Sequence, residues 1–136
     1  MQVAQSVSKY EKKLVEGLAT MLTHLPAVKV KDTNIAESEL WSTYYHPLFT
    51  YLFSDPANNV LLRWTNKAPD DYRKYRPDAI ISQFQNNVEK TIGYGECKLF
   101  NANSSAMCKD LIKLTKFTQR SLNINGRNHV FSFQIR

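Results

Sequence analysis

The chain has 136 residues, of which 43% are hydrophobic and 22% charged, and its formal net charge is +6 at pH 7. This length suits one domain with a hydrophobic core and is short for two, so we expect a single domain over residues 1–136. The composition argues against disorder, and no apolar run is long enough to predict a helix across a membrane. Two cysteines without paired spacing predict neither a disulfide framework nor a zinc site. We therefore expect an intracellular protein, nuclear or cytoplasmic, without a membrane partner.

The N-terminal segment, residues 1–31, predicts one amphipathic helix. Ser8 and Glu11 have the spacing of a capping box, and leucines then recur at helical spacing until Pro26. A helix over residues 9–25 is expected. It precedes the main part of the domain, which we place at residues 34–136.

A second helix is expected to begin after Asn34, in a stretch rich in large aromatic side chains. Pro47 should break or kink this helix after His46, because proline cannot donate the backbone hydrogen bond of a helix interior. A short helical piece should then continue to about Phe53. The aromatic side chains of this stretch are interpreted as core.

The rest of the chain predicts strands around one helix. We expect strands at 60–64, 77–84 and 88–100, a helix at 104–123 and a last strand at 129–136. The order is helix, strand, strand, strand, helix, strand, which is a mixed α/β domain (mixed α+β). The last predicted strand runs to the end of the chain, which is compatible with a core truncated at its C-terminus.

The second and third predicted strands should form a hairpin. Side chains alternate along a strand, so Glu96 and Lys98 share one face. A hairpin loop with an odd number of residues places Asp78 directly across from Glu96. A two-residue loop instead pairs Asp78 with Gly95 and sends the two carboxylates to opposite faces, unless a bulge intervenes. Gly93 and Gly95 are suitable places for such a bulge.

Asp78, Glu96 and Lys98 on one surface would form a site for a hard metal ion with a cation beside it. Carboxylates are ligands that Mg²⁺ selects, and the ion keeps positions open for water and a phosphate oxygen. Lysine would hold or help to deprotonate the attacking water and would balance the charge of the phosphate. Phosphodiester hydrolysis is the reaction that this arrangement suits.

These residues resemble a known signature. Pro77-Asp78 on one strand and Glu96-Cys97-Lys98 on the next resemble the PD-(D/E)xK motif of the restriction-endonuclease-like nuclease superfamily. The resemblance implies a restriction-endonuclease-like core with an extra N-terminal helix, and a Mg²⁺- or Mn²⁺-dependent endonuclease, a hydrolase that binds DNA. It further implies that Asp78 and Glu96 bind the metal and act in catalysis with Lys98.

The resemblance also implies one more acid from the first core helix. Glu39 is our choice of metal ligand, because Glu37 has a capping role available to it. His46 falls on the same helical face as Glu39, and we interpret it as a packing or capping side chain rather than a catalytic one.

Basic residues that flank the motif are candidates for nucleic-acid binding. Four lie along the predicted helix at helical spacing: Lys109, Lys113, Lys116 and Arg120. Three lie in the loop before Asp78: Arg73, Lys74 and Arg76. Contacts of this kind bind phosphates without reading sequence and weaken with salt. Nucleic acid, with DNA expected, is therefore the predicted partner.

Two other interpretations stay open. The chain could be a catalytically silent copy of the nuclease fold that serves as a basic nucleic-acid-binding or protein-interaction module, or the motif could be fortuitous in an unrelated α+β binding module. A homodimer and a larger parent protein are both compatible with the sequence. A complete set of Asp, Glu and Lys favours the enzyme.

Overall fold

The structure is a computed structural model that describes residues 8–31, 34–65, 76–126 and 128–136. In chain order its helical elements are α1 (Lys9–His24), α2 (Glu37–Glu39), the π-helix η2 (Leu40–Tyr45), α3 (His46–Phe53), the 3₁₀ turn η3 (Pro56–Asn58) and α4 (Ser104–Asn125). The strands are β1 (Val60–Arg63), β2 (Ala79–Gln85), β3 (Val88–Cys97) and β4 (Phe131–Ile135). The fold is mixed α+β, and the predicted order of helices and strands is confirmed.

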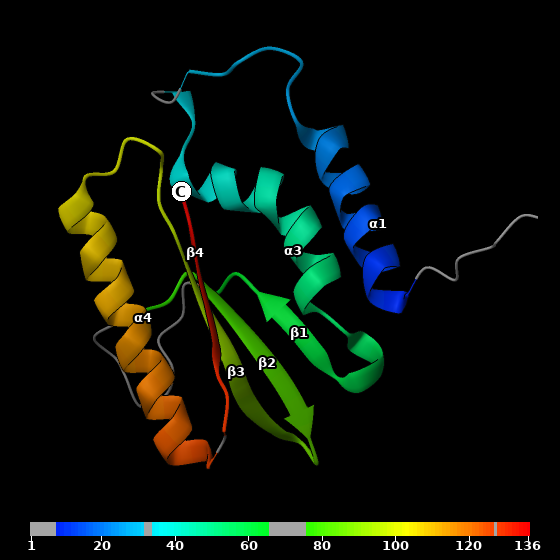
Figure 1. Cartoon of the computed structure of the whole chain (residues 1–136), viewed down its shortest axis with the longest axis vertical. Helices are drawn as coiled ribbons and strands as arrows, with labels where there is room; N and C mark the ends of the chain where they lie inside the picture. The colour runs from blue at the N-terminus through cyan, green and yellow to red at the C-terminus, as the bar shows by residue number, and fades with distance from the viewer. Residues whose placement is uncertain (1–7, 32–33, 66–75, 127) are drawn as a thin grey trace, which may run out of the picture.

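One four-stranded sheet in the order β1-β2-β3-β4 organises the described part of the chain. β1 and β2 pair antiparallel, as do β2 and β3, whereas β4 runs parallel to β3 because α4 makes the crossover between them. α4 lies on one side of this sheet, and α3 with α1 lies on the other (Figure 1). The sheet is thus covered on both faces.

Each face of the sheet has its own hydrophobic cluster. Under α4 the buried residues are Ile80, Tyr94, Leu114 and Phe117. Under α3 they are Leu62, Ala79 and Ile81, with Phe49, Phe53 and Phe133 packed against them. Side chains of β2 therefore alternate between the two helical layers: Ile80 faces α4, and Ala79 and Ile81 face α3. This alternation positions the site described below.

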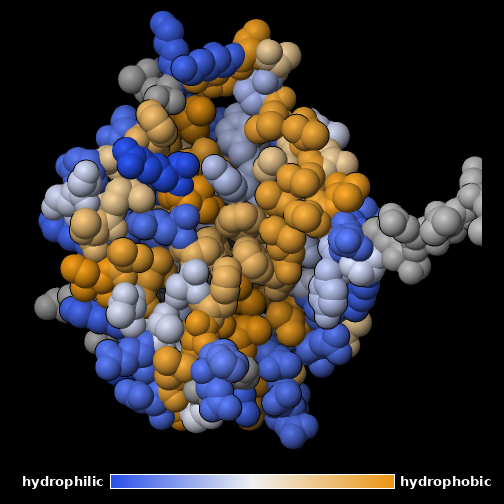
Figure 2. Space-filling model, in the orientation of Figure 1, coloured by the Kyte–Doolittle hydropathy of each residue, from blue (hydrophilic) through white to orange (hydrophobic). Residues whose placement is uncertain are grey.

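α1 begins at the predicted capping box, in which Ser8 Oγ accepts the backbone N–H of Glu11 and the Glu11 carboxylate accepts that of Ser8. The helix packs on α3 at Gly17, where an added Cβ would lie 2.9 Å from Tyr51 Cβ. Apolar side chains remain exposed over this part of the surface, including Leu22 and Val28 (Figure 2). A groove of about 440 Å³ lies beside them, between the end of α1 and the aromatic side chains of η2.

Pro47 changes the helix without ending it. α2, η2 and α3 follow one another without a gap from Glu37 to Phe53, and the π-helical hydrogen bonding gives way to α-helical bonding at His46. Pro47 falls in the first turn of α3, where its missing N–H costs little. None of the described helices has the length and hydropathy required to cross a bilayer.

Candidate functional site

Two features of the β2–β3 hairpin, a two-residue loop and a bulge, decide which residue lies opposite Asp78. Its loop has two residues, Asn86 and Asn87, with φ of 50° and 62°. Two successive positive φ values are typical of the type I′ turn that suits a tight hairpin, and asparagine tolerates them. A two-residue loop alone would pair Asp78 with Gly95. The register is corrected further along the strands.

A β-bulge in β3 makes this correction. Ser82 pairs with Thr91 and Ile81 pairs with Gly93, so Ile92 is an extra residue without a partner in β2. Beyond the bulge Ala79 pairs with Gly95. The next position in the same register places Asp78 opposite Glu96, as the hypothesis of a shared site requires, and the bulge lies directly beside one of the two glycines proposed for it.

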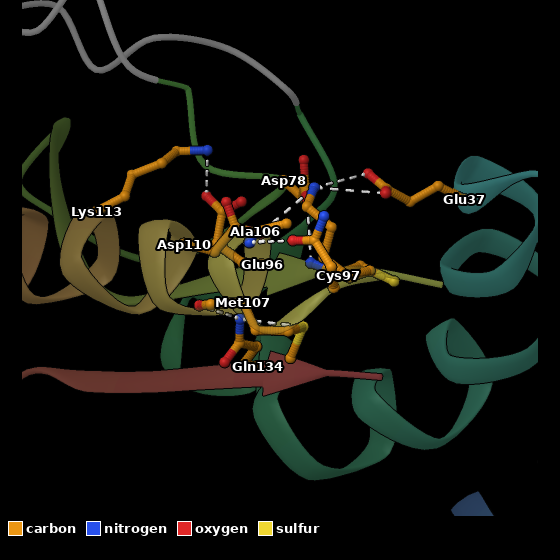
Figure 3. A network of polar contacts seen from close by, with 11 residues as sticks. Glu37, Asp78, Glu96, Cys97, Ala106, Met107, Asp110, Lys113 and Gln134 are labelled. Atoms are coloured by element: carbon orange, nitrogen blue, oxygen red, sulfur yellow. Dashed lines mark hydrogen bonds and ion pairs between the residues drawn. The ribbon is translucent and has the colours of Figure 1, made fainter. Parts of the chain in front are cut away.

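The candidate site lies on the α4 side of the sheet. Ile80 and Tyr94 pack under α4, and Asp78 and Glu96 come two residues from them along their strands. Lys98 contacts Asp110 of α4, at 3.4 Å between Nζ and Oδ2. Figure 3 shows Asp78, Glu96 and Asp110 gathered between α4, the end of β3 and α2. Glu96 and Lys98 therefore share one face, as predicted.

Glu96 is the most enclosed charged side chain at the site. Only 1% of its surface is exposed, and Lys113 Nζ lies 2.6 Å from its Oε1. Oε2 has no hydrogen-bond partner among the described residues. Burial raises the pKa of Glu96 to about 7; Lys113 opposes this rise, and the negative charge of Asp78 adds to it.

Asp78 fixes the end of the hairpin. Its Oδ2 accepts the backbone N–H of Cys97 at 2.8 Å, so the carboxylate is tied to the residue between Glu96 and Lys98. Cys97 itself is fully buried, and burial raises the pKa of its thiol to about 12. A thiol in this state is a packing group rather than a nucleophile.

Lys98 lies between two carboxylates from different helices. Its Nζ is 3.3 Å from Glu37 Oε1 on α2 and 3.4 Å from Asp110 Oδ2 on α4. Burial alone would lower the pKa of Lys98, but Asp110 and Glu37 together raise it above its ordinary value. The ammonium group is therefore held charged and aimed at one place by its two partners.

Of the two acids of α2, Glu37 contacts Lys98. Glu37 does not have the capping role expected of it, because α2 begins at Glu37 itself and its N-cap, Ala36, makes no side-chain capping bond. Glu39 is exposed. His46 accepts a hydrogen bond from Trp64 Nε1 at 3.0 Å, as suits a packing role.

The predicted basic residues differ in how exposed they are. Lys109 and Lys116 are exposed on α4, Arg120 is half-buried, and Arg76 is exposed two residues before Asp78. Lys113 turns inward to Glu96, so it lies at the site and not among the exposed basic residues of α4. Arg73 and Lys74 lie outside the described residues.

Asp110 is the site residue that sequence reasoning missed. It is buried on the face of α4 that carries Leu114 and Phe117 toward the sheet. An acid in an apolar helical stripe was the signal available, because such a position is expensive for a charge without a partner. Lys98 is that partner.

The site fits a divalent ion in the chemistry of its donors. Its carboxylates are the hard oxygen ligands that Mg²⁺ selects, and the unpaired buried oxygen of Glu96 is available to a ligand. Within the described ranges, however, no three acidic, histidine or cysteine side chains already stand at metal-ligand spacing. An ion at the unpaired Oε2 would have the Lys113 ammonium beside it, on Oε1.

The register of the β2–β3 hairpin places Asp78 opposite Glu96, with Lys98 on the same side. No protein-family model, curated protein or solved structure matches the chain.

Proposed function

We propose that this chain is a metal-dependent nuclease of the restriction-endonuclease-like kind, which hydrolyses phosphodiester bonds in nucleic acid, with DNA as the expected substrate. The observation that carries the proposal is the register of the β2–β3 hairpin. Beyond the bulge at Ile92, Asp78 stands opposite Glu96, and Lys98 lies on the same face. Without the extra residue, the two carboxylates would belong to opposite faces of the hairpin.

Asp78 and Glu96 would hold Mg²⁺ or Mn²⁺, and Glu37 is the nearest candidate for a further ligand since it reaches the same lysine. When bound, such an ion lowers the pKa of a coordinated water and offsets negative charge on the phosphate. Asp78 is already fixed by its bond to the Cys97 N–H. This preorganisation suits a ligand that has to keep its position during a reaction.

Lys98 would contact the substrate. Its ammonium is restrained by Glu37 and Asp110 and remains charged, so it can donate to a phosphate oxygen or hold the attacking water. A charged ammonium has no lone pair with which to take a proton. The role that suits Lys98 is therefore electrostatic, and the proton of the attacking water goes elsewhere.

The surface charge supports a polyanionic substrate. The chain carries a net charge of +6, and exposed Lys109 and Lys116 lie on the same helix as Asp110. Arg76, also exposed, immediately precedes the Pro-Asp pair. Cations beside a phosphodiesterase site would hold the nucleic-acid backbone without reading bases.

A second candidate is favoured by one observation. Lys113 compensates the charge of the buried Glu96 carboxylate, as would be expected of a site that has lost catalysis and retained its charges for stability. In that case the domain would be a basic binding module of the same fold.

Cleavage assays separate the two candidates. The protein is incubated with plasmid DNA, single-stranded DNA and RNA, with Mg²⁺, with Mn²⁺ and with EDTA, beside Asp78→Ala and Lys98→Ala. Glu16→Gln, which removes an exposed carboxylate from α1, is the matched control. Metal-dependent cleavage that both site variants abolish and the control retains is expected. Binding that persists in all variants without any cleavage would sink the nuclease and support the binding module.

A further inference from the structure

The ion pair between Lys113 and Glu96 is unusual in the enclosure of its acid. The side chain of Glu96 is 1% exposed and that of Lys113 is 20% exposed, and Nζ lies 2.6 Å from Oε1. A carboxylate buried to this extent needs a compensating positive charge, because loss of hydration costs several kcal/mol. Lys113 supplies this charge from the neighbouring helix.

A second pair lies beside the first with the charges reversed. Asp110 of α4 faces Lys98, the residue directly after β3, whereas Lys113 of α4 faces Glu96 of β3. Asp110 and Lys113 are three residues apart, so they lie on adjacent turns of one helical face. Glu96 and Lys98 are two residues apart, and Lys98 N still donates to Ile135 O beyond the end of β3, so both side chains lie on one side of this chain segment. α4 thus matches both charges of the Glu-x-Lys sequence.

Lys113 and a divalent ion compete for the Glu96 carboxylate. Mg²⁺ binds carboxylate oxygens at about 2.0–2.1 Å, so an ion on either oxygen of Glu96, including the unpaired Oε2, would stand beside the ammonium on Oε1 and be repelled by it. Lys113 can leave, because its side chain is partly exposed and has a flexible four-carbon stem. Glu96 cannot leave, because it is enclosed by the sheet and α4.

We propose that Lys113 occupies the Glu96 carboxylate in the metal-free protein and that binding of a divalent cation displaces it. This inference rests on the proposed function, since it takes Glu96 to be a metal ligand. Lys113 is on this view a positioning residue. It holds the buried carboxylate in place until the ion arrives, and it lowers the affinity for the ion by the free energy of the ion pair.

Metal affinity without nucleic acid is the measurement that tests the proposal. Titration calorimetry with Mg²⁺ and with Mn²⁺ is performed at pH 8.5, so that proton binding at Glu96 does not compete, on the wild type and on Lys113→Met and Lys113→Arg. Lys12→Met is the control, because it removes the lysine of an exposed lysine–glutamate pair on α1. Lys113→Met should bind each ion at least roughly fivefold more tightly, the lower end of measured coupling between two sites. Lys113→Arg, which keeps the charge, and Lys12→Met should bind like the wild type.

Thermal unfolding supplies a second readout. Lys113→Met should melt at a lower temperature than the wild type without metal, and saturating Mg²⁺ should raise its melting temperature by a larger increment. If Lys113→Met does not fold, Lys113→Gln is measured with the same expectation, because it removes the charge and keeps a hydrogen-bond donor.

The outcomes are distinct. Equal or weaker metal affinity in the uncharged variants, beside clear binding by the wild type, overturns the displacement of Lys113 and leaves the nuclease proposal intact. Failure of every variant to bind either ion overturns both.

Discussion

Asp78 and Cys97 are joined by a hydrogen bond of 2.8 Å, from the backbone N–H of Cys97 to the Asp78 carboxylate. Cys97 is the last residue of β3, and Asp78 directly precedes β2. The bond therefore closes the open end of the hairpin, where the two strands would otherwise separate. It also orients the carboxylate that we assign to a metal ion.

Asp78→Ala and Asp78→Asn should differ in stability and agree in activity. Alanine removes the acceptor of the Cys97 N–H, which should lower the free energy of unfolding by roughly 1–3 kcal/mol. Asparagine keeps an acceptor oxygen and should cost much less. Both variants lose the charge and should lose metal-dependent cleavage. Urea denaturation measures the first effect, and equal stability of the two variants would contradict the role of the hydrogen bond.

The dependence of stability on pH should contain a contribution from Glu96. Its pKa is raised from 4.5 to about 7 in the folded protein, so the folded state binds more protons than the unfolded state between these values. The free energy of unfolding contributed by Glu96 should therefore fall as the pH rises from about 4.5 to 7 and stay level above that. Glu96→Gln should abolish this fall, so that the stability of the variant relative to the wild type rises by about 1 to 3 kcal/mol across the interval.

Denaturation in urea at intervals from pH 4.5 to 8, in the presence of EDTA, measures this difference. Glu16→Gln, at an exposed site on α1, should show no comparable change with pH. A difference between Glu96→Gln and the wild type that is flat over the whole range would show that Glu96 titrates normally.

Glu37 and Glu39 provide a matched pair on one short helix. Glu37→Gln removes a charge that holds Lys98, and we expect it to lower metal-dependent cleavage by tenfold or more, about 1.4 kcal/mol in the barrier. Glu39→Gln removes an exposed charge and should leave cleavage within about twofold of the wild type. Rate constants measured under saturating metal decide between them, and a larger loss in Glu39→Gln would restore the original choice.

Gly95 should tolerate no side chain while Phe133 keeps its ring. A Cβ at Gly95 would lie 2.1 Å from Phe133 Cζ, on the strand that pairs with β3. Gly95→Ala should therefore lower the free energy of unfolding by roughly 1–3 kcal/mol, as overpacking does. Phe133→Leu combined with Gly95→Ala should recover part of this loss. Additive losses in the double variant would show that the two side chains do not compete for space.

Local signals were sufficient for the order of the elements. The capping box at Ser8 and Glu11, the helical spacing of apolar residues and the alternation along the strands each depend on neighbours in sequence. The face shared by Glu96 and Lys98 follows from the same alternation. The sequence alone did not decide the register of the hairpin, because Asn86 and Asn87 do not show where a strand will bulge.

Three features of the site depend on contacts between distant elements. The bulge at Ile92 forms where the sheet packs against two helical layers. Glu37 contacts Lys98, which lies 61 residues further along the chain. From its spacing, Lys113 was predicted to bind nucleic acid with the other basic residues of the helix. It lies three residues from Asp110, at the border of the buried face, and its long stem reaches Glu96.

The π-helix η2 implies a simple geometric sensitivity. A π-helical segment usually differs from an α-helix by one inserted residue, and each α-helical residue turns the chain by about 100°. Deleting one residue between Leu40 and Tyr45 would restore the α-helical phase and rotate Glu37 by about that angle relative to α3, away from Lys98. The side chains of the site would all still be present, but one carboxylate would face another direction. A single insertion or deletion in this helix is therefore enough to bring Glu37 to Lys98 or to take it away.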